Sequence, residues 1–334
     1  SVLLFSFFFW VSLMPTVMSG EVLTFNMNEW IPPYGITLVV DSFSIIFLVL
    51  VSGMGLFMSP VIEKFVKHRR SEFYSLYLLL MVGMSGILMT GDIFNLFVFT
   101  EIMVISSYSL TLFLRDDKSL EAGFKYIIVG AFASSLILLG ITLLYGQTGT
   151  LNMADLIVKI NLRQSLIPLG LIMAGYLTEM GVVPFHLWKP DVVEAVTPPL
   201  GAIIVSVSTS VSAYALFRVL FVFGLLEVNY LLMILGLISI VVGAFMALFQ
   251  DDLRRLLAYS SVSQMGYILF AFGLGSIGFV AGTFHMMNNI LLKMVMFLVV
   301  GAVIYRHGKV EPVNMPIAGF CFLLASLGIA GIPP

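Results

Sequence analysis

A few ionisable residues lie inside stretches that are otherwise apolar, and their types are suited to moving ions. Glu101, Glu179 and Lys293 each fall within an apolar stretch long enough to cross a lipid bilayer. Glu101 lies eight residues into its stretch, which is about 12 Å along a helix axis. A charge at bilayer depth costs ~2.5–3.5 kcal/mol on insertion scales, so each of these residues indicates a functional site.

A second feature is a polar stripe that contains Lys293. His285, Asn289 and Lys293 recur at i, i+4 and i+8, which places them on one face of a helix. Imidazole and a lysine removed from water can both take up and release a proton, so the stripe can carry protons. A satisfied hydrogen-bond network between helices is the alternative interpretation. Lys125 is a further candidate, although it lies near the cytoplasmic start of its helix and can extend to the surface.

Pro184 predicts a break in the helix that carries Glu179. Proline removes one backbone donor and obstructs the preceding turn of a helix. Broken helices at membrane depth often line ion sites, because their freed backbone groups need a polar cavity. A purely structural kink is the alternative. The adjacent Trp188 and Lys189 are expected to anchor the chain at the membrane interface.

The composition excludes a water-soluble enzyme. Of 334 residues, 60% are hydrophobic and 10% are charged, and the mean hydropathy is +1.09, so the solvent of much of the surface is lipid. The single cysteine, Cys321, excludes intramolecular disulfides, Cys-rich iron–sulfur binding and Cys-ligated structural zinc. We therefore expect no cofactor and no metal in this chain. A formal charge of −2 gives no footprint for nucleic acid.

The elements that must position these residues are membrane helices. The sequence divides into about eleven apolar stretches of helical length, which predicts an all-α polytopic membrane protein and excludes strands. Segment 149–165 is expected to lie along the outer surface. The predicted spans are 1–19, 36–59, 73–90, 93–114, 122–145, 166–189, 200–222, 229–249, 256–274, 278–304 and 316–332.

Lys and Arg are unevenly divided between alternate loops, and this predicts the orientation. Short basic loops stay cytoplasmic, and most of the basic residues fall in one set of loops, as at 64–70 and 254–255. The chain starts without Met and stops at Pro334, inside an unfinished helical element, so we expect it to lack segments at both ends.

Three segments resemble a known family. The runs GDIFNLFVFTE at 91–101, VPFHLWKPD at 183–191 and DLRRLLAYSS at 252–261 are similar to the antiporter-like proton-translocating subunits. These subunits occur in respiratory complex I, Mrp-type cation/proton antiporters and membrane-bound hydrogenases. The runs at 34–41 and 293–305 resemble the Mrp and hydrogenase branch most. The resemblance extends from about residue 30 to the C-terminus.

The resemblance implies a single membrane domain over 1–334 with two inverted five-helix repeats, at about 73–190 and 200–334, each with a broken helix. It implies that Glu101 is the regulating glutamate of the fifth helix, that Lys293 is the central lysine and that His285 lies beside it. Pro333 matches the second helix break. It also implies that the chain works among other membrane subunits, including further antiporter-like ones, with a possible peripheral redox module, in the cell membrane of a prokaryote.

This chain departs from the family at two lysine positions. Glu179 stands where the family has the lysine partner of the helix-five glutamate, and Ser210 stands where a further lysine is common. Two carboxylates at mid-membrane cannot both ionise cheaply. Glu179 can pair with Lys293, a cation such as Na⁺ can neutralise the carboxylates, or this half-channel can be silent.

The sequence therefore predicts an ion-translocating subunit, for H⁺, Na⁺ or both, of a multi-subunit complex. It is expected to perform no bond chemistry itself, whether the complex is an oxidoreductase or an antiporter. The first alternative is a non-pumping structural or assembly subunit with a degenerate proton path. The second is a self-contained secondary transporter.

Overall fold

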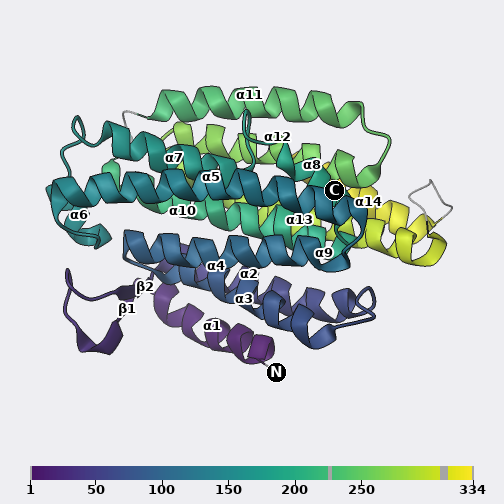
Figure 1. Cartoon of the computed structure of the whole chain (residues 1–334), viewed down its shortest axis with the longest axis horizontal. Helices are drawn as coiled ribbons and strands as arrows, with labels where there is room; N and C mark the ends of the chain where they lie inside the picture. Colours follow the sequence, from purple (N-terminus) through teal and green to yellow (C-terminus); the bar gives the residue numbers. More distant parts are fainter. Residues whose placement is uncertain (1, 225–227, 309–314, 333–334) are drawn as a thin grey trace. The chain divides into compact units, whose positions relative to one another are not determined.

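Helices make up most of the structure, a computed structural model that describes residues 2–224, 228–308 and 315–332 (Figure 1). The predicted all-α polytopic fold is confirmed. Within the described residues, eight helices are long and apolar enough to cross a membrane. Three shorter apolar helices, Val2–Met18, Leu166–Met180 and Pro316–Ile329, occupy further predicted spans. The number of about eleven spans stays a prediction.

The longer helices follow the predicted apolar stretches in chain order. They are α1 (Val2–Met18), α2 (Ser42–Glu63), α3 (Arg70–Met89), α4 (Ile93–Thr111), α5 (Asp117–Thr148), α7 (Leu166–Met180), α10 (Thr209–Phe223), α11 (Asn229–Leu248), α12 (Leu253–Gly273), α13 (Ser276–His307) and α14 (Pro316–Ile329). The shorter helical elements are η1 (Met27–Glu29), η2 (Leu112–Leu114), α6 (Met153–Lys159), α8 (Trp188–Ala195), α9 (Pro198–Ala202) and the π-helix η3 (Ile203–Ser208).

The chain divides into two compact units that interleave along the sequence. Unit 1 comprises Ser1–Leu110, Ile127–Glu179 and Val211–Gly224, and unit 2 comprises Thr111–Tyr126, Met180–Ser210 and Leu225–Pro334. Each unit therefore contains segments that are far apart in the chain. The single domain over 1–334 and its repeats at about 73–190 and 200–334 stay predictions.

Glycines let helices approach closely in both units. In unit 2, a Cβ on Gly236 of α11 would lie 2.6 Å from the backbone nitrogen of Phe270 on α12. In unit 1, a Cβ on Gly175 of α7 would lie 2.7 Å from the carbonyl oxygen of Ala133 on α5. Small residues at such contacts are how membrane helices gain packing energy, because lipid tails are as apolar as the side chains.

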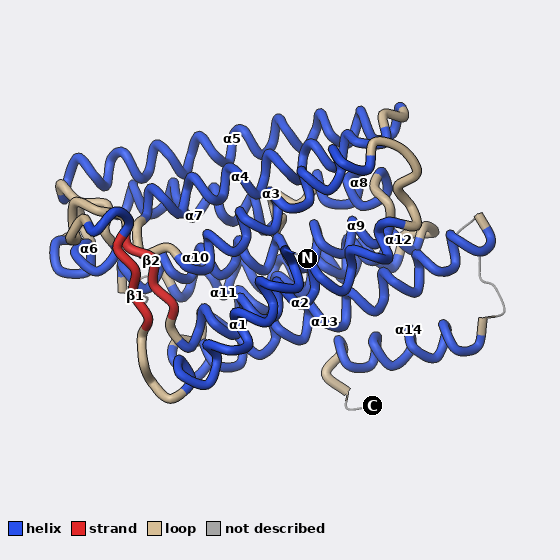
Figure 2. Tube along the Cα trace, turned by 90° about the horizontal axis from the view of Figure 1, so that it is seen from below, coloured by secondary structure: helices blue, strands red, loops and turns tan. Residues whose placement is uncertain are grey.

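A short hairpin precedes α2, so the exclusion of strands was wrong for this part of the chain (Figure 2). Strand β1 (Leu23–Asn26) pairs antiparallel with β2 (Thr37–Val40). The span predicted at 36–59 therefore begins too early, since residues 37–40 are strand and the helix starts at Ser42. Hydropathy alone cannot separate an apolar strand from the helix that follows it.

Asp41 marks the true start of α2. Its Oδ1 accepts hydrogen bonds from the backbone N–H of Phe43 at 3.1 Å and of Ser44 at 2.9 Å, and Ser44 Oγ accepts from the Asp41 N–H at 2.8 Å. This is a capping box, which satisfies donors that the first helical turn leaves free. Arg218 of α10 also pairs with Asp41 at 2.6 Å. Burial alone would raise the pKa of the Asp41 carboxyl, but the Arg218 guanidinium and the hydrogen bonds from Ser44 lower that pKa below its ordinary value.

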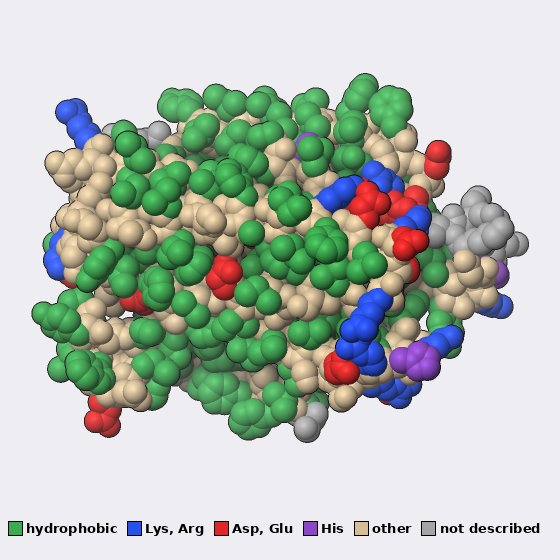
Figure 3. Space-filling model, viewed as in Figure 1, with side chains coloured by type: hydrophobic (Ala, Val, Ile, Leu, Met, Phe, Trp, Pro, Cys, Tyr) green, Lys and Arg blue, Asp and Glu red, His purple; other side chains and the backbone are tan. Residues whose placement is uncertain are grey.

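The outer surface of the helices is apolar. Figure 3 shows hydrophobic side chains over most of the visible face, with few charged ones. Large apolar side chains such as Phe5, Ile128, Ile234 and Val280 are between 57% and 73% exposed. A soluble protein rarely exposes contiguous apolar surface of this extent, whereas lipid requires it.

We predict that Asp41→Ala lowers the stability of the protein by about 1–2 kcal/mol, because it removes a helix cap and leaves Arg218 without its carboxylate. Thermal unfolding in detergent measures the effect. The contribution should be complete above the ordinary pKa of 3.8 and should be lost as the pH falls through the lower pKa of the folded state. Lys159→Ala, which breaks an exposed ion pair on α6, is the control. An equal effect of both variants would contradict the prediction.

Candidate functional site

The first group of candidate residues lies in unit 1, where α4, α5 and α7 meet. Glu101 of α4 is half-buried and accepts a hydrogen bond from the hydroxyl of Ser134 on α5. The preceding residue, Thr100, lies 3.3 Å from the hydroxyl of Tyr176 on α7. These contacts join α4 to α5 and to α7 at the half-buried Glu101.

Glu179 of α7 joins this group. Its side chain is 4% exposed, and its Oε1 has no hydrogen-bond partner among the described residues. It lies three residues after Tyr176 and therefore on the same face of α7. Glu179 interacts electrostatically with Glu101. The structure thus brings two carboxyl groups together, one of them buried and incompletely satisfied.

The helix that carries Glu179 ends directly after it. α7 stops at Met180, Gly181 adopts a left-handed φ of +61°, and α8 begins only at Trp188. Pro184 lies within this break. The N–H of Val183 lies between the two helices and donates instead to Ser239 Oγ on α11 at 3.1 Å. The second predicted break, Pro333, lies outside the described residues.

Lys189 is not an interfacial anchor, and that prediction was wrong. Its side chain is 0% exposed and Trp188 is 3% exposed. Lys189 Nζ donates to the carbonyl oxygen of Met180 at 2.7 Å, and the Trp188 ring stacks on Tyr126 at 4.3 Å. The break turns the chain back, so both side chains point into unit 2. A tryptophan–lysine pair beside apolar sequence is typical of an interface, and only the backbone path after Gly181 distinguishes the two cases.

Lys293 lies at the centre of the second group, in unit 2. It is on α13, is 0% exposed, and donates to Ser260 Oγ and to the carbonyl oxygen of Leu257 at 3.1 Å on α12. Among the ion pairs of the described residues, none includes Lys293. A buried ammonium held only by neutral oxygens is poorly compensated, which is the situation expected of a group that gains and loses its charge.

His285 and Asn289 lie on the same helix as Lys293 but do not bond to it directly. His285 Nε2 lies 2.7 Å from Gln264 Oε1 on α12, and its ring contacts Tyr267. The side chain of Asn289 is 1% exposed, and its Oδ1 and Nδ2 have no hydrogen-bond partner in the described part of the protein. Buried amides in proteins are normally hydrogen-bonded to protein or to water. Asn289, four residues from both His285 and Lys293 on α13, is therefore a position where a water molecule could hydrogen-bond to a buried amide.

Ser210, predicted to stand where the family commonly has a lysine, is fully buried. Its hydroxyl donates to the carbonyl oxygen of Ser206 at 2.7 Å, within the same helical segment. Ser206 belongs to the π-helix η3, in which the backbone carbonyl of Val205 accepts from Ser261 Oγ of α12 at 3.2 Å. π-helical turns occur frequently at functional sites, and the hydropathy pattern gives no sign of one.

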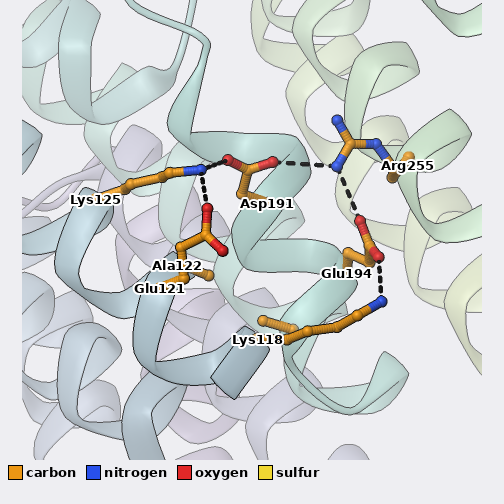
Figure 4. A pocket seen from close by; sticks show the side chains of 8 residues that line it. Lys118, Glu121, Ala122, Lys125, Asp191, Glu194 and Arg255 are labelled. Carbon is orange, nitrogen blue, oxygen red and sulfur yellow. Dashed lines mark hydrogen bonds and ion pairs between the residues drawn. The ribbon is translucent and has the colours of Figure 1, made fainter. Parts of the chain in front are cut away.

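Lys125 lies in a separate, charged pocket within unit 2 (Figure 4). It is exposed and pairs with Glu121 at 2.8 Å and Asp191 at 2.9 Å. The structure therefore places Lys125 outside the two buried groups. The pocket has a volume of about 180 Å³ and is lined by Lys118, Glu121, Ala122, Lys125, Asp191, Glu194, Ala195 and Arg255.

Glu194 joins two basic side chains of the pocket, as Asp191 does. It accepts from Lys118 at 2.8 Å and from Arg255 at 2.8 Å (Figure 4). The hydrogen bond from Lys118, followed by that from Arg255, holds the pKa of the Glu194 carboxyl below its ordinary value against the opposing effect of burial. The pocket is thus a network of fixed charges, unlike the uncompensated Lys293.

Comparison with known proteins gives the arrangement a context. Residues 90–334 match the model of the family described as "NADH:quinone oxidoreductase/Mrp antiporter, TM". The chain is 36% identical over 346 residues to NADH-quinone oxidoreductase subunit N of Desulforudis audaxviator, covering 97% of this chain and 69% of that protein.

Two solved structures have the same fold. One is from the membrane-bound sulfane sulfur reductase, an archaeal respiratory membrane complex, with a TM-score of 0.95, 32% identity, and coverage of 99% of this chain and 72% of that one. The other is from the Mrp complex of Dietzia sp. DQ12-45-1b, with a TM-score of 0.92, 28% identity, and coverage of 100% and 65%. The chain thus spans about two thirds of the length of the proteins it resembles.

Glu194→Ala should lower the free energy of unfolding by about 1 kcal/mol, because it leaves Lys118 and Arg255 without their shared carboxylate. The matched control is Glu121→Ala, whose side chain is 70% exposed and whose effect should stay within about 0.5 kcal/mol. The difference between wild type and Glu194→Ala should be present above the ordinary pKa of 4.5 and lost as the pH falls through the lower folded value. Thermal unfolding in detergent at several pH values tests this.

Proposed function

The chain belongs to the NADH:quinone oxidoreductase/Mrp antiporter transmembrane family, and from this premise we propose that it is an ion-translocating subunit of a multi-subunit membrane complex. The observation that carries the proposal is Lys293, a fully buried lysine whose only hydrogen-bond partners among the described residues are two neutral oxygens. A membrane protein keeps such a group only where its charge has a use.

The two buried groups have distinct parts in this proposal. In unit 1, Glu101 and Glu179 form a pair of carboxyls that shares a proton or holds a cation such as Na⁺ between them. In unit 2, Lys293 takes up and releases a proton, with Asn289 and His285 along the same helix face. The pairing of Glu179 with Lys293 stays a prediction.

The driving force comes from outside this chain. Moving one charge across a membrane involves ~2.3 kcal/mol per 100 mV. In this proposal the chain makes and breaks no covalent bonds and holds no cofactor, so it supplies no such energy itself. Relatives named as parts of respiratory, sulfane sulfur reductase and Mrp complexes support neighbouring membrane subunits, antiporter-like ones included, and a redox or antiport event in a partner. We place the chain in the cell membrane of a prokaryote, with its basic loops, such as 64–70, on the cytoplasmic side.

A structural subunit with a silent ion path is the second candidate. It is favoured by Ser210, whose hydroxyl bonds to its own helix among the described residues, and by Glu179, which stands in a lysine position of the family that the sequence resembles. The two candidates differ in whether the buried residues matter for transport.

We expect Lys293→Ala to reduce ion transport by about tenfold or more while the complex assembles normally, since a proton-transferring side chain typically contributes ~10²–10⁴-fold. Proton movement is measured with a pH-sensitive dye, and sodium movement with radioactive sodium, in sealed vesicles that hold the intact complex. Lys159→Ala, on the surface of α6, should leave transport unchanged.

Glu179→Gln separates the two candidates further. If the carboxyl takes part in transport, its neutral amide should slow transport in the same vesicles, because the amide neither binds a proton nor attracts a cation. Glu179→Lys and Ser210→Lys restore the family's pattern and should increase transport if the path is silent in the wild type. Unchanged transport in both Glu179→Gln and Lys293→Ala, with normal assembly, would establish the structural subunit instead.

A further inference from the structure

Lys189 is a second fully buried lysine in unit 2. Its side chain is 0% exposed, and the hydrogen bond that the structure gives its ammonium is to the carbonyl oxygen of Met180 at 2.7 Å. Among the described residues, none of the ion pairs includes it. An ammonium taken out of water without a carboxylate carries a penalty of several kcal/mol, so this is an expensive position for a lysine.

The break between α7 and α8 is shaped around this side chain. A Cβ on Gly181 would lie 2.6 Å from Lys189 Cε and 3.2 Å from Nζ. Gly181 has a φ of +61°, a left-handed conformation in which a residue with a side chain would be strained. The Trp188 ring centroid lies 6.0 Å from the ammonium and its stacking on Tyr126 fixes one wall. The lysine therefore occupies a built position at the end of a broken helix.

Polar groups lie near both Lys189 and Lys293. Lys189 interacts electrostatically with His186 and with Lys293. The His186 ring lies 6.3 Å from that of Tyr259 on α12, and the residue after Tyr259, Ser260, accepts from Lys293. His186 is 7% exposed, and its Nδ1 has no hydrogen-bond partner within the described residues. The imidazole, three residues before Lys189 in the chain, thus keeps a polar atom without a partner among the described residues.

The chemistry at the break also calls for a cation. Met180, whose carbonyl Lys189 binds, follows Glu179 in the chain. The carbonyl end of a helix carries partial negative charge, and a positive side chain there is favourable. Lys189 thus reaches back from α8 and supplies positive charge at the end of α7, where the sequence has a glutamate at the position expected to hold a lysine.

We propose that Lys189 is a further ion-translocating residue, which exchanges a proton with Lys293 through the polar groups around His186. The inference rests on the proposed function. Two ammonium groups that repel each other favour states in which only one is protonated. When Lys189 releases its proton it becomes a neutral amine, and the Lys293 amine that receives the proton becomes an ammonium, so the charge of the pair is conserved.

The test is Lys189→Gln in the intact complex, assayed for ion transport in sealed vesicles. Glutamine can still donate to the Met180 carbonyl but carries no charge and exchanges no proton. We expect transport to fall by about tenfold or more with assembly and thermal stability retained. Lys159→Gln, which removes an exposed lysine, should have no effect. Wild-type transport by an assembled Lys189→Gln complex would overturn the proposal.

A second variant covers failure of the first to assemble. Lys189→Arg keeps the positive charge and the donor, but a guanidinium does not release its proton. An assembled Lys189→Arg complex that does not transport supports the proposal, and one that transports normally overturns it. Lys293→Ala in the same vesicles separates the role of Lys189 from the proposed transport function of the whole chain. Loss of transport in Lys293→Ala alone refutes the role of Lys189 and leaves the proposed function intact, whereas loss in neither refutes both.

Discussion

The expense of placing a charged side chain in a medium of low dielectric constant determines how this protein is built. A buried polar group needs a partner, and inside a membrane helix the partner must come from a neighbouring helix or from water. Ser134 on α5 donates a hydrogen bond to Glu101 on α4, and Ser260 on α12 accepts one from Lys293 on α13. Each bond requires its two helices to keep one separation and one register. The ionisable residues therefore constrain the packing around them as much as the packing constrains the residues.

Close backbone contact makes those short polar bonds possible. A hydroxyl on a serine is short, so it reaches a side chain on the next helix only where the helices approach closely. In unit 1, Gly130 of α5 permits such an approach to α4, since a Cβ there would collide with the Tyr108 side chain. In unit 2, Gly282 of α13 permits it to α12, since a Cβ there would lie 3.1 Å from the Phe272 ring. In lipid, where apolar side chains gain nothing by leaving the solvent, this close packing and the bonds across it are the main source of association.

The sequence predicts the helices well, because they follow from the lengths of apolar stretches. The depth of Glu101 and Lys293 in the membrane stays a prediction. Prediction from the sequence fails where one residue changes the direction of the chain. Asp41 starts α2 by capping it, so the strand before it was included in a helix. Gly181 turns the chain at the break, and Lys189 is buried where the sequence predicts an interfacial anchor. Hydropathy averages over a window and carries no information on where a side chain points after a break.

The two departures from the family's lysine pattern differ in their physical consequences. At Ser210 the hydroxyl bonds to a carbonyl of its own helix, so the loss of a cation there leaves no buried group in need of a partner. At Glu179 a buried carboxyl oxygen has no partner among the described residues. The next residue, Met180, ends the helix, and its carbonyl oxygen accepts a hydrogen bond from the buried Lys189. An inert packing position would be cheaper as an apolar or hydroxyl residue. Among the described residues, a buried polar atom without a partner therefore remains at Glu179, whereas the Ser210 hydroxyl is satisfied within its own helix.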